Sequence, residues 1–364
     1  MVLKNKKLKL LLLIGIVGFF ATHSLYSVKA KNFTRTQSWS NTHGKNKTVI
    51  TLKYGGPNHL TPIEATVTKN GKLIHTFKKA KDFSKKNRKD YPVLYEKFSG
   101  FKKLAGKVKK ALALLKKYDP FGYSIYSKIK DKSSFDGYIQ SGNEFINGKI
   151  PPLETMDTAV HEISHQLDME NFRSQGNSYY TIKGTFLQVT KISKLPKRSV
   201  VYELLSKEDK EDWDLKGKAD TYLANVSGTM PFEMLLEELN AYTIGANTVL
   251  QLTEGKKSPY EIGTVNPGII HMMRFTSLYL DNLKAKKLGL YKKMKRNKAY
   301  TTVILKLWRQ AEKVVNRTCA SKKAMFNTPE MDKETLKRTY SDKSINGLKS
   351  LFKQETFEVP QKCN

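Results

Sequence analysis

Residues 151–168 read Pro-Pro-Leu-Glu-Thr-Met-Asp-Thr-Ala-Val-His-Glu-Ile-Ser-His-Gln-Leu-Asp. The two prolines favour the start of a helix, and no glycine or proline follows before Gly176, so this segment is predicted to be helical. Residues four apart lie on one face of a helix. His161 and His165 are therefore predicted to present two imidazoles to one side, where both can bind the same metal ion.

A second interpretation treats the two histidines and Glu162 as ordinary core residues. An HExxH sequence arises by chance in roughly one chain in a hundred of this composition, which includes 7 His in 364 residues. Histidine and especially glutamate are seldom buried without partners, and the neighbours Ala159, Val160, Ile163 and Leu167 are apolar. A shared metal ion explains the polar groups better.

A catalytic zinc ion normally has three protein ligands and one open position, so a second segment must supply another group. The metzincin arrangement is excluded, because Asp168 and Asn171 stand where it requires glycine and histidine. Glu237 and Glu238 lie in an apolar segment after Pro231 that is predicted to be helical. Either carboxylate can complete the site if this helix packs against the first.

Two motifs together resemble those of the gluzincin metallopeptidases. The first is HExxHxxD at residues 161–168, and the second is Glu-x-x-Ala-Tyr at residues 238–242. Within that clan the sequence is most similar to the anthrax lethal factor catalytic domain and the Pro-Pro endopeptidases, in which a sheet precedes the HExxHxxD helix. The similarity covers about residues 135–250, and its first motif is the more specific.

The resemblance implies a zinc site in which Glu162 is the general base. The zinc ligands that it implies are His161, His165 and Glu238. Other acidic residues remain alternatives for the third ligand: Glu237, Glu203 and, in an aspartate-type site, Asp220. In a site of this kind zinc activates water and the glutamate accepts its proton.

The chain departs from these relatives at two places. The interval between His165 and Glu238 is longer, which requires an insertion from about residue 174 to residue 229. Pro231 stands where the relatives have a tyrosine, two turns before the glutamate ligand. The residue that stabilises the oxyanion therefore stays open. Tyr242 is the first candidate, and the others are Tyr222, Tyr179 and Tyr180.

Two further polar residues have predicted roles. Asp168 is expected to orient a ligand histidine or to cap a nearby backbone group. His271 lies in the apolar segment 269–273 and is expected to be a core residue and not a ligand.

The N-terminus has the features of an export signal. Lysines precede an apolar run at residues 10–20, and Val28-Lys29-Ala30 is a small-residue cleavage site, so residues 1–30 are predicted to be a signal peptide. The run is too short for a comfortable membrane span, and no transmembrane anchor is expected after cleavage. The only two cysteines, Cys319 and Cys363, can pair in an oxidising medium. The mature chain is predicted to be secreted.

The chain is strongly basic. Residues 1–30 carry five lysines and no acidic residue, so their removal lowers the formal net charge from +32 to +27. Such a polycation is attracted to anionic cell-surface polymers, with strong salt dependence. An ordinary lysine-rich surface explains the charge equally well, and no specific nucleic-acid partner is expected. A protein or peptide is the expected substrate.

Periodicity predicts the remaining elements. Residues 31–47 are polar and expected to be loose. Strands are expected at residues 48–52, 63–68 and 73–77, with a turn at Asn70-Gly71, and as a strand pair within 135–149. Helices are expected at residues 91–117, 231–252, 269–288 and 298–315, followed by a helical or partly ordered tail from residue 321.

These elements predict an α+β fold, in which a small mixed sheet packs on the HExxH helix and a mainly helical C-terminal subdomain follows. The expected domains are the signal peptide 1–30, a basic N-terminal region 31–130, a catalytic region 131–318 and a tail 319–364. The function predicted is a secreted zinc-dependent endopeptidase. The alternative is a non-catalytic secreted protein that binds polyanions or the cell wall and keeps a relic metal motif. An intact Glu162 argues against this alternative.

Overall fold

The computed structural model describes residues 35–43, 46–54, 62–77, 106–141, 150–171 and 176–363. The chain divides into two compact units, Met1–Tyr95 and Glu96–Asn364. The expected signal peptide lies outside the described residues, and so do residues 91–105 of the expected basic helix and residues 142–149 of the expected strand pair.

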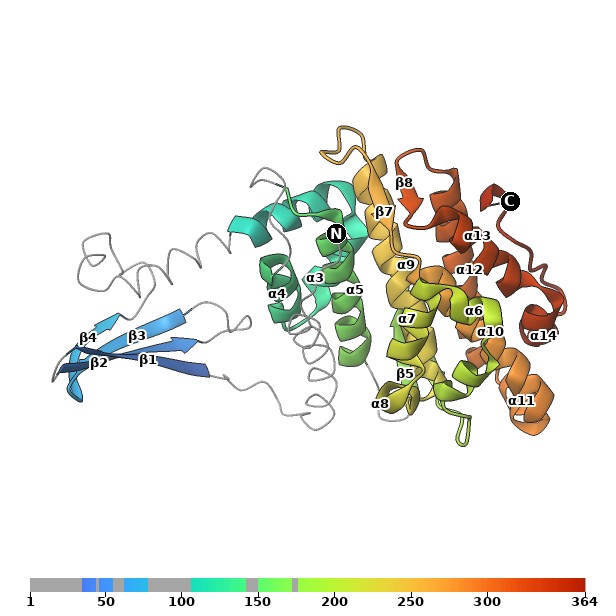
Figure 1. Ribbon diagram of the computed structural model, residues 1–364, viewed down its shortest axis with the longest axis horizontal. Coiled ribbons are helices and arrows are strands. Elements are labelled where there is room, and N and C mark those ends of the chain that lie inside the picture. The colour runs from blue at the N-terminus through green and yellow to red at the C-terminus, as the bar shows by residue number, and fades with distance from the viewer. Residues whose placement is uncertain are drawn as a thin grey trace. The chain divides into compact units, whose positions relative to one another are not determined.

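The first unit contains an antiparallel sheet with the strand order β1-β2-β3-β4 (Figure 1). Its strands are β1 (Arg35–His43), β2 (Asn46–Tyr54), β3 (Pro62–Lys69) and β4 (Lys72–Phe77). Asn70 and Gly71 join β3 to β4 with φ angles of 50° and 79°, which suit asparagine and glycine in a tight hairpin turn. The three predicted strands and this turn are confirmed. The prediction that residues 31–47 are loose is wrong for β1, a polar strand without apolar alternation that forms through its pairing with β2.

The second unit is mainly helical (Figure 1). Its helices begin with residues 106–118 and continue as α3 (Pro120–Lys128), α4 (Ser133–Ser141), α5 (Leu153–Glu170), η3 (Arg198–Leu204), α6 (Lys207–Glu211), α7 (Trp213–Tyr222), α8 (Asn225–Gly228), α9 (Phe232–Glu254), α10 (Gly268–Lys286), α11 (Leu288–Arg296), α12 (Lys298–Ala320), α13 (Pro329–Tyr340), α14 (Asp342–Leu351) and η4 (Gln361–Cys363). Two small sheets accompany them: β5 (Gly176–Tyr180) with β6 (Phe186–Thr190), and β7 (Gly263–Val265) with β8 (Ala324–Phe326). The predicted α+β class is confirmed.

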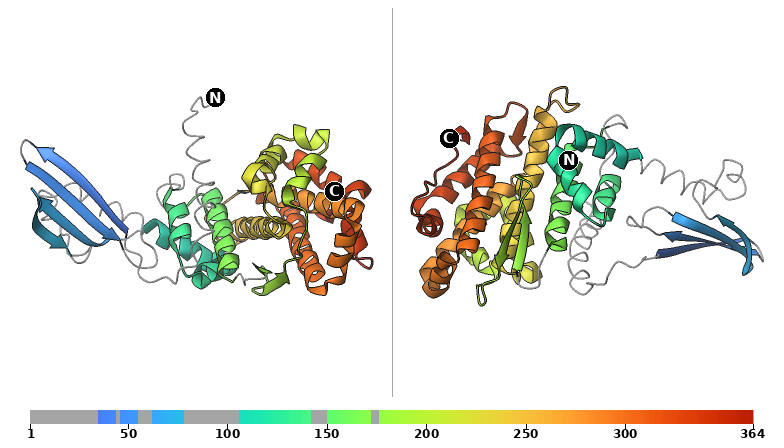
Figure 2. Two further views of the ribbon diagram at one scale, coloured as in Figure 1. Left: turned by 90° about the horizontal axis from the view of Figure 1, so that it is seen from below. Right: turned by 180° about the vertical axis from the view of Figure 1, so that it is seen from behind.

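Helix α9 lies at the centre of this unit. Twenty of its 23 residues are buried, as expected of a helix that is surrounded by other elements. One apolar core packs α9 against α5 and the helices that precede it, and a second core packs α9 against α10 and α12. Figures 1 and 2 show α9 between the green helices on one side and the orange and red helices on the other. The expected helices at 231–252, 269–288 and 298–315 correspond to α9, α10 and α12.

The segment expected as the first strand of the 135–149 pair is helical instead. Residues 133–141 form α4, in which Phe135 and Ile139 are fully buried. These two residues are four apart and therefore lie on one helical face, a period that outweighs the strand-like composition. The tail expected from residue 321 contains β8, α13 and α14, so it is helical and packed on α10.

A disulfide joins Cys319, at the end of α12, to Cys363 in η4. The sequence left open whether these two cysteines pair; the structure shows that they do, which indicates an oxidising environment. Among the described residues, no helix has the length and apolar character to cross a membrane.

Candidate metal centre

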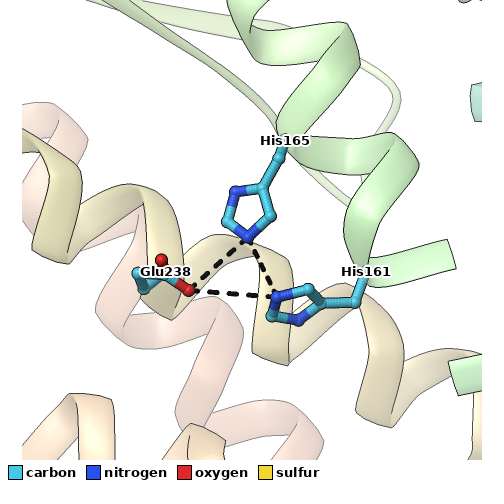
Figure 3. Close-up of side chains that lie close together, drawn as sticks. All are labelled: His161, His165 and Glu238. Atoms are coloured by element: carbon cyan, nitrogen blue, oxygen red, sulfur yellow. Dashed lines mark hydrogen bonds and ion pairs between the residues drawn. The ribbon is translucent and has the colours of Figure 1, made fainter. Parts of the chain in front are cut away.

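Helices α5 and α9 bring three ligand-type side chains together. His161 and His165 are one turn apart on α5, and Glu238 faces them from α9 (Figure 3). The two helices approach closely at Gly245, where a Cβ atom would lie only 2.1 Å from the carboxylate oxygen Oδ1 of Asp157. A larger residue at this position would push α9, and with it Glu238, away from the histidines.

The three side chains converge through one atom each. The two Nε2 atoms of His161 and His165 are 2.9 Å apart, and Glu238 Oε2 lies 3.9 Å from His161 Nε2 and 3.5 Å from His165 Nε2. These side chains are only 10%, 9% and 4% exposed. Two imidazole nitrogens and a carboxylate oxygen are a donor set for a divalent metal ion. This group of His161, His165 and Glu238 is called the metal triad below.

The fit to a metal ion rests on an unsatisfied atom. Glu238 Oε2 is buried and has no hydrogen-bond partner among the described residues. A buried carboxylate oxygen without a partner is costly. The cost is removed when a cation binds between this oxygen and the two Nε2 atoms.

Hydrogen bonds from the back of the triad fix the two rings. His165 Nδ1 is hydrogen-bonded to Glu237 Oε1, and the His161 ring is hydrogen-bonded to the backbone of Ala241. An Nδ1–H that donates to a carboxylate leaves the Nε2 lone pair free to face a metal ion and raises its basicity. Glu237, an alternative third ligand, therefore contacts a histidine from behind and is not part of the triad.

The protons of the triad are unequally held. Burial and the neighbouring His165 lower the pKa of His161 to about 3. Burial acts in the same sense on His165, but the carboxylates of Glu237 and Glu238 outweigh it and raise the pKa of His165 well above its usual value. Without a metal ion, His165 therefore carries a second proton, on Nε2, in addition to the one on Nδ1. It can donate this proton across the 2.9 Å contact to His161 Nε2.

Glu162 stands beside the triad and remains half-buried. Burial raises its pKa, the neighbouring His165 opposes this effect, and Glu238 adds to it. The hydroxyl of Tyr138 on α4 donates a hydrogen bond to the Glu162 carboxylate. A raised pKa and a fixed orientation suit a group that accepts and returns a proton near neutral pH.

Two of the four candidate tyrosines lie at the triad. The Tyr242 ring meets the His161 ring edge-on, with centroids 4.5 Å apart. Its hydroxyl lies 2.9 Å from Lys218 Nζ and 2.9 Å from the Tyr222 hydroxyl. Burial and the charge of Glu238 raise the pKa of Tyr222, and Glu162 adds to the effect, so the Tyr222 hydroxyl is within electrostatic range of both acids.

The remaining candidates lie elsewhere. Tyr179 is buried and donates a hydrogen bond to the backbone oxygen of Glu233, whereas Tyr180 stacks on Phe121. The other acids considered as third ligands are on the surface: Glu203 is exposed, and Asp220 pairs with Lys216 and Tyr202. His271 is fully buried in α10, outside the triad, as expected of a core residue.

Asp168 caps a backbone group, which is one of its two expected roles. Its Oδ1 accepts a hydrogen bond of 2.5 Å from the backbone N–H of Tyr180, and its Oδ2 accepts one of 3.2 Å from Asn240 Nδ2. Asn240 also donates to the Tyr180 backbone oxygen at 3.0 Å. These bonds tie strand β5 to both α5 and α9.

Two basic residues at the site were not anticipated. Lys218 contacts Tyr242, and Arg198 donates from Nε to the Ser227 backbone oxygen at 2.9 Å and from Nη2 to the Ser227 hydroxyl. Arg198 is 4% exposed, its Nη1 has no hydrogen-bond partner in the described part of the chain, and it interacts electrostatically with Glu238. Both residues belong to the insertion, which carries no motif, so no signal separates them from the rest of the 65 lysines and arginines.

No family model, curated protein or solved structure matches the chain. The arrangement of the metal triad therefore carries the functional argument.

Proposed function

We propose that the protein is a secreted zinc-dependent endopeptidase. The observation that carries this proposal is the convergence of His161, His165 and Glu238, with Glu162 placed next to them. A His–His–Glu set with one acidic neighbour is what zinc peptidases use. A metal site with a purely structural role has no need of an acidic neighbour such as Glu162.

The donor types favour zinc. Zinc accepts imidazole nitrogen and carboxylate oxygen, and its catalytic sites combine three protein ligands with one open position. In this proposal His161 Nε2, His165 Nε2 and Glu238 Oε2 hold the ion. When bound in such a site, zinc lowers the pKa of bound water towards neutrality and polarises the substrate carbonyl.

Glu162 is the proposed general base. Its carboxylate accepts the proton of the attacking water and then gives it to the leaving amine nitrogen. Burial favours the return of the proton, because it raises the pKa of this carboxyl group. The Tyr138 hydroxyl holds the carboxylate in one orientation during both transfers.

Tyr222 is the proposed donor to the oxyanion. A lysine ammonium group can only donate hydrogen bonds, so Lys218 Nζ donates to the Tyr242 hydroxyl oxygen. We assign the Tyr242 hydrogen to the Tyr222 oxygen, which leaves the Tyr222 hydrogen for the substrate. Chains of this kind strengthen each successive donor. In this assignment Tyr242, the first candidate from the sequence, positions Tyr222.

Secretion is supported by the Cys319–Cys363 disulfide. The net charge of +27 that remains after removal of residues 1–30 supports attachment to anionic polymers at the cell surface, which would concentrate the enzyme there. The proposed substrate is a protein or peptide that reaches the enzyme at this location.

The test is cleavage of an unbiased peptide pool by the purified protein. We expect cleavage that disappears on zinc chelation and in Glu162→Gln, which still binds about one zinc ion per chain. Glu154→Gln, a substitution of an exposed acid on the same helix, is the matched control and keeps full activity.

Tyr222→Phe is expected to lower kcat by about 10²–10³-fold, as the loss of one oxyanion donor does. A smaller loss in Tyr222→Phe than in Tyr242→Phe would reverse the roles assigned to the two tyrosines.

Two outcomes contradict the proposal. Unchanged cleavage by Glu162→Gln would show that Glu162 is not the general base, and it would contradict the proposed mechanism. A wild-type chain that binds no zinc, cleaves no peptide and binds anionic polymers in a salt-sensitive way would support the non-catalytic alternative.

A further inference from the structure

Arg198 is a buried cation without an ion pair. The residue is 4% exposed, and no carboxylate among the described residues pairs with its guanidinium group, whose Nη1 also has no hydrogen-bond partner there. Arg274 is 5% exposed and shows the usual arrangement, because its Nη2 lies 2.8 Å from Oδ2 of Asp209. A buried charge without such a partner is costly. Packing alone therefore does not explain the position of Arg198.

Hydrogen bonds fix Arg198 through both its backbone and its side chain. The backbone N–H donates to the oxygen of Met230, just before α9, at 3.0 Å. In the side chain, Nε donates to the backbone oxygen of Ser227 at 2.9 Å, and Nη2 donates to the Ser227 hydroxyl. The positive charge is therefore held in one place beside the start of α9, the helix that carries Glu238.

The fixed charge lies against Tyr222. The Cζ atom of Arg198 is 5.7 Å from the centroid of the Tyr222 ring. At this distance a cation is attracted to the electron-rich face of an aromatic ring. The same ring meets the Tyr242 ring edge-on, with centroids 6.1 Å apart. Arg198 and Tyr242 together therefore restrict the orientation of Tyr222, the proposed donor to the oxyanion.

The same charge acts on the metal triad. Arg198 is within electrostatic range of Glu238 and, more weakly, of Glu237. A positive charge stabilises negative charge nearby and repels another cation, and both effects are strong where water is excluded. The first effect favours the negative charge that the Tyr222 oxygen gains when its hydrogen is shared with an oxyanion. The second effect disfavours metal binding. An electrostatic role thus has consequences of opposite sign for turnover and for metal affinity.

We propose that Arg198 is a positioning residue, which orients Tyr222 and makes its hydroxyl a stronger donor to the oxyanion, while it lowers the metal affinity of the triad. Arg198 acts through Tyr222 and does not contact the substrate, because its side chain is buried. The inference rests on the proposed function and adds a residue to it. The alternative is a structural clamp between η3 and α8, whose removal would lower stability, zinc affinity and kcat together.

Zinc titration tests the electrostatic role without turnover. Arg198→Gln removes the charge and keeps a side-chain donor for the Ser227 backbone oxygen. We expect zinc to bind about 10-fold more tightly to this variant than to wild type, because a repelling charge is absent. Arg198→Lys keeps the charge and should keep the wild-type affinity. Equal or weaker zinc binding by folded Arg198→Gln would overturn the proposal. A wild-type chain that binds no zinc would instead contradict the proposed function itself.

A cycle of two substitutions tests the link to Tyr222. We expect Arg198→Gln to lower kcat about 10-fold with little change in KM, as the loss of a buried contact between a cation and an aromatic ring does. In the Tyr222→Phe background the hydroxyl is absent, so the same substitution should lower kcat less than about 3-fold. Equal losses in the two backgrounds would show that Arg198 does not act through Tyr222, and they would overturn the proposal.

Arg338→Gln is the matched control. Arg338 Nε lies 3.0 Å from Oδ1 of Asp209, and its side chain is 18% exposed. This variant should lose stability in urea unfolding, with zinc affinity and kcat unchanged. Arg198→Met is a second neutral variant if glutamine prevents folding, since an apolar side chain of similar length needs no partner. It should show the same rise in zinc affinity and the same fall in kcat, and a fall in both quantities would support the structural clamp instead.

Discussion

Two buried clusters of charged residues in the second unit are built in opposite ways. In the first, Asp209 is completely buried and its two oxygens accept from Arg274 Nη2 at 2.8 Å and from Arg338 Nε at 3.0 Å. In the second, the metal triad, three atoms with lone pairs face one another and Glu238 Oε2 has no hydrogen-bond partner among the described residues. The Asp209 cluster is complete without a ligand, whereas the triad is not.

The difference separates a structural role from a binding role. The Asp209 cluster joins α6, α10 and α13, since each of its three residues belongs to a different helix. Removing one partner there leaves a buried charge unpaired, and the fold loses stability. At the triad a proton on His165 or a metal cation is needed to offset the repulsion among the convergent lone pairs. Substitutions in the two clusters should therefore alter different properties.

The largest effect is expected from Glu238→Gln. The amide keeps the shape of the side chain but lacks the charge that attracts a cation. We expect the zinc affinity to fall by more than the roughly 10- to 100-fold loss that follows removal of an outer partner. The metal-free fold should lose at most the attraction between Glu238 and protonated His165, whose Nε2 lies 3.5 Å from Oε2, because Glu238 Oε2 has no hydrogen bond to give up. Zinc titration and urea unfolding of the same variant measure both quantities, and unaltered zinc affinity would exclude Glu238 as a ligand.

The next effect is expected from Asp209→Asn, which should leave zinc affinity unchanged. Breaking a buried ion pair costs about 3–5 kcal/mol in the free energy of unfolding. Burial alone would raise the pKa of Asp209, but hydrogen bonds and the charge of Arg274 outweigh it and lower this pKa. The stabilisation is therefore complete above the ordinary aspartate pKa of 3.8 and is lost as the pH falls through the lowered value.

Urea unfolding at several pH values measures this difference. The gap between wild type and Asp209→Asn should be largest near neutral pH and should close at low pH. A gap that widens as the pH falls would contradict the lowered pKa, and a loss of zinc binding would contradict the separation between the two clusters.

The smallest effect is expected from Glu237→Gln. This substitution weakens the carboxylate that orients His165 but leaves the three converging atoms in place. An outer partner of this kind contributes about 10- to 100-fold to metal affinity. We expect a loss in that range by zinc titration, with Glu154→Gln unchanged. Complete loss of zinc would instead make Glu237 a direct ligand.

Local sequence spacing was enough to predict two of the three members of the metal triad, His161 and His165. His161 and His165 are one turn apart, so helical geometry alone places them together. Glu238 required the packing of α9 on α5, which the resemblance suggested but periodicity could not establish. Glu237 and Glu238 are equally buried neighbours, and only the crossing of the two helices decides which one faces the histidines.

Other parts of the structure had weaker signals. The helices α9, α10 and α12 were predicted because each is long and has many apolar residues at helical spacing. The short helix α4 was predicted as a strand, since nine residues give too few turns to reveal a helical period. Strand β1 was missed because its stability comes from its neighbour in the sheet. Arg198 and Lys218 reach the site only through tertiary packing.

Because of the Cys319–Cys363 bond, the stability of the segment that contains α13 and α14 depends on the redox state of the surroundings. It closes a loop of 44 residues that contains α13 and α14, both packed on α10. Closing a loop of this length removes freedom from the unfolded chain that corresponds to about 4 kcal/mol. In a reducing compartment the helix that carries Arg338 would be released more easily, and Asp209 would lose one of its two partners. The fold would thus be less stable in a reducing compartment than in an oxidising one, where the disulfide persists.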